Sequence, residues 1–328
     1  MMSQRHALLQ QWAQQIEQNS DLTLQLISGD ASFRRYYRAA GCIWVDAPPA
    51  TEKNREFIAN SAALLNAQIK APQVLHADLD NGFLCVSDLG DRSLLSCLSE
   101  ASVTVWYARA LQLLPKFTQV DLALPEFDAE FMARENAIFP EWLLETHLQL
   151  VLSAEEKALL ADTFALLTEN NLSQPQVVMH RDFHSRNLMV TDDDALAVID
   201  FQDMVLGPLT YDAVSLLKDC YCRWPDEVIA HGTQHVWQLY ADSGILDGNT
   251  DPAQFRQWLD LTGMQRHLKA AGIFARLHHR DGKSGYLNDI PRTLGYVRDV
   301  AASYPQLSVF SDWLQQRVLP AFKMDVSV

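Results

Sequence analysis

A short polar segment between apolar runs most constrains what this chain can fold into. Residues 180–187 read His-Arg-Asp-Phe-His-Ser-Arg-Asn and follow the apolar run 177–179. A second apolar run, 195–199, comes after an acidic turn and ends at the next carboxylate. Short apolar runs bounded by turn residues are typical of buried strands, so we predict that these two runs form a hairpin-like pair. The pairing would bring three oxygen-bearing residues to one edge: Asp182, Asn187 and Asp200.

These residue types, in this order, suit phosphoryl transfer. A carboxylate such as Asp182 can accept the proton of an attacking hydroxyl and hold it in line, so we assign Asp182 as the catalytic residue. Asn187 and Asp200 offer one neutral and one charged oxygen ligand for a Mg²⁺ ion that bridges the phosphates of ATP. The alternative is an acidic turn with a buried polar network and no chemistry, because Asp and Asn are common in loops.

Composition limits the class of protein. The chain has 328 residues, 48% of them hydrophobic and 20% charged, which is typical of a globular protein of about two domains. A formal net charge of −15 argues against a nucleic-acid or anionic-membrane surface. The five cysteines include no C-x-x-C pair, and the Gln-rich N-terminal helix has neither the pattern of a signal peptide nor that of a membrane span. We expect a cytoplasmic monomer with no nucleic-acid or membrane partner.

Residues 1–90 predict an opening helix and five short strands, and the rest of the chain is mainly helical in pattern. A helix that runs to about Ile69, with Thr51 as its N-cap, follows the third strand. We therefore predict an α+β fold of two lobes. Residues 1–90 form the N-terminal nucleotide-binding lobe with a five-stranded antiparallel sheet, and residues 91–328 form the helical catalytic and substrate lobe. The strands are expected at 24–27, 33–38, 41–45, 74–77 and 83–86.

The loop after the first strand is a candidate phosphate cradle, because small side chains let backbone N–H groups approach an anion. Arginines that follow the loop add positive charge to an acidic chain. The connector at 87–90 is expected to hold the adenine through its backbone groups. We assign these residues to nucleotide binding: Ser28, Gly29, Asp30, Ser32, Phe33, Arg34, Asp88 and Leu89.

Taken together, these features resemble the aminoglycoside-phosphotransferase and choline-kinase branch of the kinase-like fold, over nearly the whole chain. The polar segment and residues 200–202 are similar to the H-R-D-x-x-x-x-N and D-F-G elements of protein kinases, with Gln202 in place of the glycine. The resemblance extends to the bacterial anomeric sugar kinases. It implies ATP-dependent phosphorylation of the C1 hydroxyl of N-acetylmuramate and N-acetylglucosamine, in peptidoglycan recycling. The stretches that carry it are 28–36, 46–49, 184–189, 200–203, 265–269 and 272–277.

N-acetylmuramate carries a lactyl carboxylate, so the resemblance implies a basic group in its pocket. Arg266 and Arg280, on a late predicted helix, are our candidates. For each of them the alternative is a basic helix end that complements the helix dipole. His184 and Arg186 are expected to contact the γ-phosphate or the sugar, with anchoring of their loop as the alternative. Asp203 is expected to contact the metal or the sugar, so all five residues are assigned to substrate binding.

One departure from the kinase pattern leaves questions open. Protein kinases carry a lysine on the third strand that binds the α- and β-phosphates, and Asp46 stands at that position here. The charge must come from Lys53, Arg34, Arg35 or Arg38, unless the strand register differs. Two other functions stay open. One is a kinase for another hydroxyl compound of the aminoglycoside, choline or homoserine type. The other is a nucleotide-binding pseudokinase.

Overall fold

The structure is a computed structural model that describes residues 4–28 and 33–322, without the side chain of Ser28. The chain forms two compact units. Unit 1 comprises residues 1–97, 116–123 and 186–204, and unit 2 comprises 98–115, 124–185 and 205–328. The chain therefore passes from unit 2 to unit 1 between Ser185 and Arg186, and it returns between Met204 and Val205. The division at residue 90 stays a prediction from the sequence.

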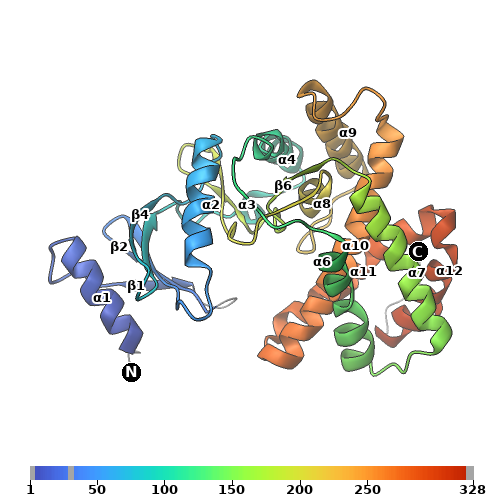
Figure 1. Cartoon of the computed structure of the whole chain (residues 1–328), viewed down its shortest axis with the longest axis horizontal. Helices are drawn as coiled ribbons and strands as arrows, with labels where there is room; N and C mark the ends of the chain where they lie inside the picture. The colour runs from blue at the N-terminus through green and yellow to red at the C-terminus, as the bar shows by residue number, and fades with distance from the viewer. Residues whose placement is uncertain (1–3, 29–32, 323–328) are drawn as a thin grey trace. The chain divides into compact units, whose positions relative to one another are not determined.

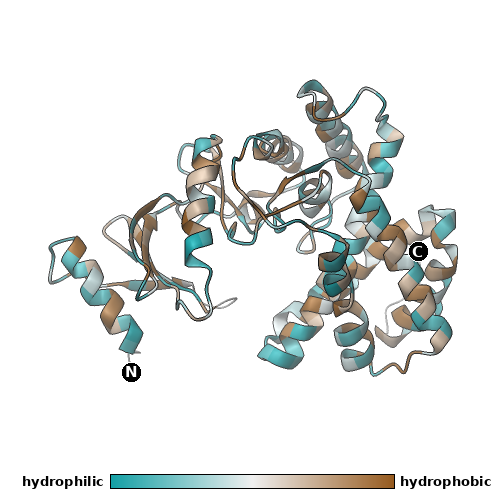
Figure 2. Ribbon diagram, in the orientation of Figure 1, coloured by the Kyte–Doolittle hydropathy of each residue, from teal (hydrophilic) through white to brown (hydrophobic). Residues whose placement is uncertain are grey.

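Unit 1 contains the predicted five-stranded antiparallel sheet, so this prediction is confirmed. The central strands β3 and β5 are buried along most of their length, and hydrophobic residues run along the strands (Figure 2). In spatial order the strands are β1 (Gln25–Ser28), β2 (Arg35–Ala39), β3 (Cys42–Asp46), β5 (Phe83–Ser87) and β4 (Val74–Asp78).

The sheet of unit 1 lies between the helices α1 (Gln4–Ile16) and α2 (Asn54–Asn66) (Figure 1). On the α1 side the rings of Trp12 and Trp44 meet edge to face at 5.5 Å. The predicted cap of α2 is wrong. The N-cap is Lys53, whereas Thr51 belongs to a turn in which its N–H and its hydroxyl both donate to the carbonyl oxygen of Pro48.

The strands around the polar segment pair differently from the prediction. In unit 2, β6 (Gln176–Met179) pairs with β9 (Val205–Pro208), while in unit 1, β7 (Leu188–Val190) pairs with β8 (Leu196–Val198). The predicted hairpin between residues 177–179 and 195–199 is therefore wrong. The acidic turn joins β7 to β8 instead. The three residues of β7 are too few for an alternation pattern to identify them as a strand.

Unit 2 is built around the 30-residue helix α10 (Pro252–Asp281), against which α7, α8, α11 and η1 pack (Figure 1).

The structure also forms short helices α3 (Leu94–Cys97) and α5 (Leu114–Phe117). Among the described residues, none of the helices combines the length and apolar character that a membrane-spanning segment needs. The other helices of unit 2 are α4 (Val103–Leu111), α6 (Ala129–Asn136), the π-helix η1 (Phe139–His147), α7 (Ala154–Leu172), α8 (Tyr211–Leu217), α9 (Asp226–Asp242), η2 (Ser284–Asp289), α11 (Ile290–Ser303), η3 (Pro305–Leu307), α12 (Ser308–Trp313), η4 (Leu314–Val318) and η5 (Leu319–Phe322).

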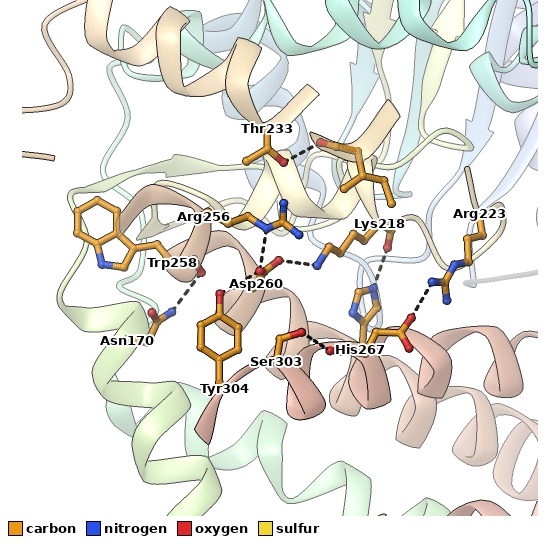
Figure 3. A network of polar contacts seen from close by, with 12 residues as sticks. Asn170, Lys218, Arg223, Thr233, Arg256, Trp258, Asp260, His267, Ser303 and Tyr304 are labelled. Atoms are coloured by element: carbon orange, nitrogen blue, oxygen red, sulfur yellow. Dashed lines mark hydrogen bonds and ion pairs between the residues drawn. The ribbon is translucent and has the colours of Figure 1, made fainter. Parts of the chain in front are cut away.

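A buried polar network fixes α10 in place (Figure 3). The carboxylate of Asp260 accepts from Lys218 Nζ at 2.6 Å, from Arg256 Nε at 2.8 Å and from the Tyr304 hydroxyl at 2.9 Å. Two turns further along α10, His267 Nε2 lies 2.7 Å from the carbonyl oxygen of Lys218. Lys218 and Tyr304 lie outside α10, so their contacts to Asp260 and His267 restrain the rotation of the helix about its axis. The same helix carries Arg266 and Lys269.

Candidate active site

Asn187 and Asp200 lie just beyond the ends of the β7–β8 hairpin in unit 1. The N–H of Ile199 donates to the carbonyl oxygen of Asn187 at 3.0 Å, which continues the ladder past the paired strands. Asn187 Nδ2 is 3.5 Å from Asp200 Oδ2. Asp200 has a φ of 67°, in the left-handed region that residues other than glycine rarely adopt. The structure thus brings the two predicted metal ligands together.

This pair fits a Mg²⁺ ion. Mg²⁺ takes few protein ligands and completes its octahedron with water and phosphate oxygens. A half-turn of the Asn187 amide presents its oxygen in place of its nitrogen. Gln202 Nε2 donates to Asp200 Oδ1 at 2.8 Å, which leaves the other carboxylate oxygen for a cation. In the described part of the chain no group of three or more His, Cys, Asp or Glu residues can hold a metal ion, so a metal here depends on the nucleotide for further ligands.

A buried arginine belongs to the same neighbourhood of unit 1. Arg34 Nε lies 3.1 Å from a carboxylate oxygen of Glu52, and the guanidinium stacks on the ring of Phe57 at 5.0 Å. Burial raises the pKa of the Tyr36 phenol. Arg34 lowers this pKa and Asp200 raises it, and each of these two effects is smaller than that of burial. Tyr36 is therefore close enough to both Arg34 and Asp200 to interact with each of them electrostatically.

The other groups considered for the missing lysine have partners elsewhere in unit 1. Asp46 accepts from Arg5 Nε at 2.8 Å, so it binds a cation of α1 rather than standing free at a phosphate site. Arg38 donates two hydrogen bonds to the carboxylate of Asp88, at 2.6 and 3.0 Å. Arg35 is exposed. Lys53, whose side chain is largely exposed, pairs with the partly exposed Asp203 at 2.6 Å. Among these candidates only Arg34 is buried, and it shares the neighbour Tyr36 with Asp200.

The structure describes part of the predicted nucleotide loop. Gly29, Asp30 and Ser32 lie outside the described residues, and only the backbone of Ser28 is described. Phe33 is 70% exposed, so its ring is accessible to a ligand. In the connector, Gly90 N–H donates to Asp88 Oδ1 at 2.9 Å. Because that carboxylate also binds Arg38, a nucleotide base would use the backbone groups around Leu89, which is half-buried.

In unit 2, two carboxylates from the α8 region hold the loop that carries Asp182. Asp212 accepts from the N–H groups of His180 at 2.6 Å and Arg181 at 3.0 Å. Asp219 accepts from the N–H of Ser185 at 2.9 Å and from its hydroxyl at 2.5 Å. Arg181 has a φ of 75°, a strained conformation that these bonds maintain.

Basic side chains control the charge of Asp182. Burial would raise the pKa of this carboxyl, but Lys269, His184, Arg266 and Arg181 outweigh burial and lower the pKa to about 2. Asp182 is therefore ionised at neutral pH, as a proton acceptor must be. Lys269 is itself held in place, with Nζ 2.7 Å from the Tyr211 hydroxyl and 3.5 Å from a carboxylate oxygen of Glu135. Arg181 Nη2 binds the same Glu135 at 2.5 Å.

Of the two predicted carboxylate-binding arginines, the structure brings only Arg266 to Asp182. Arg266 is 4% exposed, and its Nη1 lies 3.5 Å from the Cys220 sulfur. Its Nε has no hydrogen-bond partner within the part of the chain that the structure describes. Arg280 pairs with Asp281 at 2.8 Å, about 21 Å further along α10 at 1.5 Å per residue.

The remaining predicted substrate residues lie in different settings. His184 is buried, and its ring meets that of Tyr221 edge to face at 5.1 Å. Burial lowers the pKa of His184 despite the nearby carboxylates of Asp219 and Asp182. Arg186 is exposed in unit 1, as is much of the Asp203 side chain that pairs with Lys53.

Comparison with known proteins agrees with this geometry. The sequence model of the phosphotransferase enzyme family matches residues 23–258. The chain belongs to the phosphotransferase enzyme family. An N-acetylmuramate/N-acetylglucosamine kinase of Pseudomonas aeruginosa is 39% identical over 296 residues, which are 88% of this chain and 86% of that protein. Its namesake from Neisseria meningitidis is 37% identical over 316 residues, 93% of each chain.

A solved structure supports the fold assignment. The ethanolamine kinase of Plasmodium vivax superimposes with a TM-score of 0.65 at 13% identity, covering 93% of this chain and 89% of that one. At this identity the likeness concerns the fold alone. It confirms the predicted two-lobe α+β fold for this member of the phosphotransferase enzyme family.

Sequence reasoning missed several residues that surround the predicted ones in this phosphotransferase. Lys269 stands three positions after Arg266, so helical spacing already placed both on one face of α10. No sequence pattern indicated Glu135 or Glu52. Glu135 lies 46 positions from its partner Arg181, and Glu52 lies 18 positions from its partner Arg34. Their roles depend on tertiary contacts.

Proposed function

We propose that this protein is an ATP-dependent kinase that phosphorylates the anomeric hydroxyl of N-acetylmuramate and N-acetylglucosamine. The observation that carries the proposal is the Asp182 loop, whose backbone Asp212 and Asp219 hold by hydrogen bonds and whose carboxylate lies near cations of α10. The Asn187–Asp200 pair in unit 1 supports a cation-dependent phosphoryl donor. Relatives of that name at 37–39% identity over most of the chain support the acceptor.

In the proposed reaction, unit 1 binds ATP. Arg34 contacts the phosphates, the connector around Leu89 binds the base, and Asn187 and Asp200 hold Mg²⁺. When bound, Mg²⁺ neutralises charge on the phosphates. Asp182 accepts the hydrogen bond of the sugar hydroxyl and orients its oxygen toward the γ-phosphorus. Proton transfer comes late, because the transition state is loose, so a weakly basic carboxylate suffices.

The charge around Asp182 also favours the sugar acid as an acceptor. Arg266 is buried beside Asp182, and its Nε has no hydrogen-bond partner among the described residues, so the guanidinium can take a further anionic partner. The lactyl carboxylate of N-acetylmuramate is an anion of the right kind. A cationic acceptor such as choline would instead meet Arg266 and Lys269, which disfavours the rival assignment. We further propose that the enzyme is a cytoplasmic monomer in peptidoglycan recycling.

An acceptor panel tests this proposal. Purified protein is given MgATP and, in turn, N-acetylmuramate, N-acetylglucosamine, choline, homoserine and an aminoglycoside, and ADP release is followed. We expect turnover with the two amino sugars only, no turnover with Asp182→Asn, and unchanged binding of a fluorescent ATP analogue to that variant. Turnover with a cationic acceptor alone would replace the acceptor assignment. Nucleotide binding without turnover in wild type would support a pseudokinase, and equal activity of Asp182→Asn and wild type would refute the catalytic role.

A further inference from the structure

Helix α2 holds the segment of unit 1 that carries Asp200. The side-chain amide of Asn60 donates from Nδ2 to the carbonyl oxygen of Phe201 at 2.7 Å, inside the core. One turn earlier on the same helix face, the ring of Phe57 packs on the ring of Phe201 at 4.8 Å and 31°. Residues three apart share a helix face, so α2 contacts both the backbone and the side chain of the residue that follows Asp200.

These contacts act on a strained backbone. Asp200 has its left-handed φ of 67° immediately before Phe201, which is fully buried. A buried carbonyl needs a hydrogen-bond donor, and a second donor to the Phe201 oxygen is the N–H of Met204, at the longer distance of 3.3 Å. The Asn60 amide therefore makes the shorter bond to the carbonyl of the residue that follows Asp200, and it restrains the backbone immediately after that carboxylate.

The same helix also contacts the phosphate-binding candidate. Phe57 stacks on the Arg34 guanidinium at 5.0 Å, and Asn60 is one turn from Phe57. We propose that Asn60 is a positioning residue. By holding the Phe201 carbonyl, it sets the direction of the Asp200 carboxylate, and with it the affinity of the site for a divalent cation and nucleotide. The inference rests on the role of Asp200 in the proposed function.

Helix α2 offers a matched control for the test. Asn54 is also buried, and its Nδ2 donates to the carbonyl oxygen of Ala47 at 2.8 Å. Asn54→Ala and Asn60→Ala therefore each remove a buried amide-to-carbonyl bond from one helix, but only Asn60 contacts the residue next to Asp200. Binding of Mn²⁺, which stands in for Mg²⁺, is measured by electron paramagnetic resonance in the presence of ADP, together with thermal unfolding.

The expected result is a Kd for Mn²⁺ that is about tenfold higher in Asn60→Ala, the scale of one lost hydrogen bond, and unchanged in Asn54→Ala at a similar loss of Tm. Equal Kd values in wild type and Asn60→Ala, or equal increases in both variants, would overturn the inference. If Asn60→Ala does not fold, Asn60→Ser, which leaves a small polar group in the same space, is measured instead against the same outcomes. No sugar is used, so failure of wild type to phosphorylate either sugar would count against the proposed acceptor and leave this result standing.

Discussion

The Arg34 guanidinium lies 3.1 Å from the carboxylate of Glu52 and stacks on Phe57. Glu52 precedes helix α2, and Arg34 precedes strand β2. The pair therefore joins a carboxylate at the start of a helix to a cation at the start of a strand. Protein kinases achieve the same combination with a lysine of the third strand and a glutamate of the helix that follows it. Asp46 does not provide that cation, because it accepts from Arg5. We infer that Arg34 takes the place of the lysine.

Removing Arg34 is therefore expected to weaken nucleotide binding. A charge-assisted contact contributes about 1.5–3 kcal/mol, so Arg34→Ala should raise the KM for ATP by about ten- to hundredfold. Arg35→Ala removes the neighbouring arginine, which is exposed, and should leave that KM within about twofold of wild type. Steady-state kinetics with varied ATP measures both, and equal effects of the two variants would contradict the assignment.

Lys269 is predicted to set the acid limit of activity. The pKa of Asp182 is lowered by its cations, so the active carboxylate is retained at acid pH and lost only as pH falls through that pKa. In Lys269→Met fewer cations oppose the effect of burial on Asp182, so the pKa of Asp182 rises. The acid limb of the pH profile of kcat/KM then moves to higher pH, by about one unit. The exposed Lys157→Met on α7 serves as the control. A folded Lys269→Met with an unshifted limb would show that Lys269 does not act on Asp182.

Arg266 is predicted to distinguish the two sugars. Loss of a charged contact to the lactyl group should raise the KM for N-acetylmuramate by about tenfold or more in Arg266→Ala, and the KM for N-acetylglucosamine much less. Arg280→Ala, which removes a largely exposed arginine paired with Asp281, should change neither constant. Paired KM determinations on both sugars decide the matter. A larger increase of the KM for N-acetylmuramate in Arg280→Ala would instead assign carboxylate binding to Arg280, at the end of α10.

Gly272 is predicted to be required for close packing of α10. A Cβ at this position would lie 2.6 Å from the carbonyl oxygen of Ile138 and 2.9 Å from Cα of Phe139. Alanine is the better helix former, yet the overlap should lower the free energy of unfolding by about 1–3 kcal/mol in Gly272→Ala. Chemical denaturation measures this change. Gly285→Ala, where no described heavy atom lies within 4 Å of the added carbon, should be nearly neutral.

The sequence predicted the parts of this protein that depend on local pattern. Short alternating strands and turn residues were sufficient for the five-stranded sheet, and the spacing of the polar segment brought out Asn187 and Asp200 as neighbours. The strand partners of residues 177–179 and 195–199 were predicted wrongly. Pairing is a long-range choice, and each run found a better partner in β9 and in β7.

Local sequence patterns also could not predict which charged residues would lie at the site. The sequence left four candidates for the phosphate-binding cation, and Arg34 is distinguished by its burial and by Tyr36, the neighbour that it shares with Asp200. Arg266 and Arg280 read alike in the sequence as basic residues of one helix. The structure separates them, because a residue's rotation and depth in the fold follow from contacts such as those of Asp260.

The central claim is that the enzyme transfers phosphate to the anomeric oxygen of an amino sugar. A phosphorus NMR spectrum of the product formed from MgATP and N-acetylmuramate tests it most directly. We predict the signal of a sugar 1-phosphate, with the phosphorus coupled to the anomeric proton. A signal coupled to the protons of carbon 6, or the absence of any sugar phosphate from active, folded protein, would contradict the account.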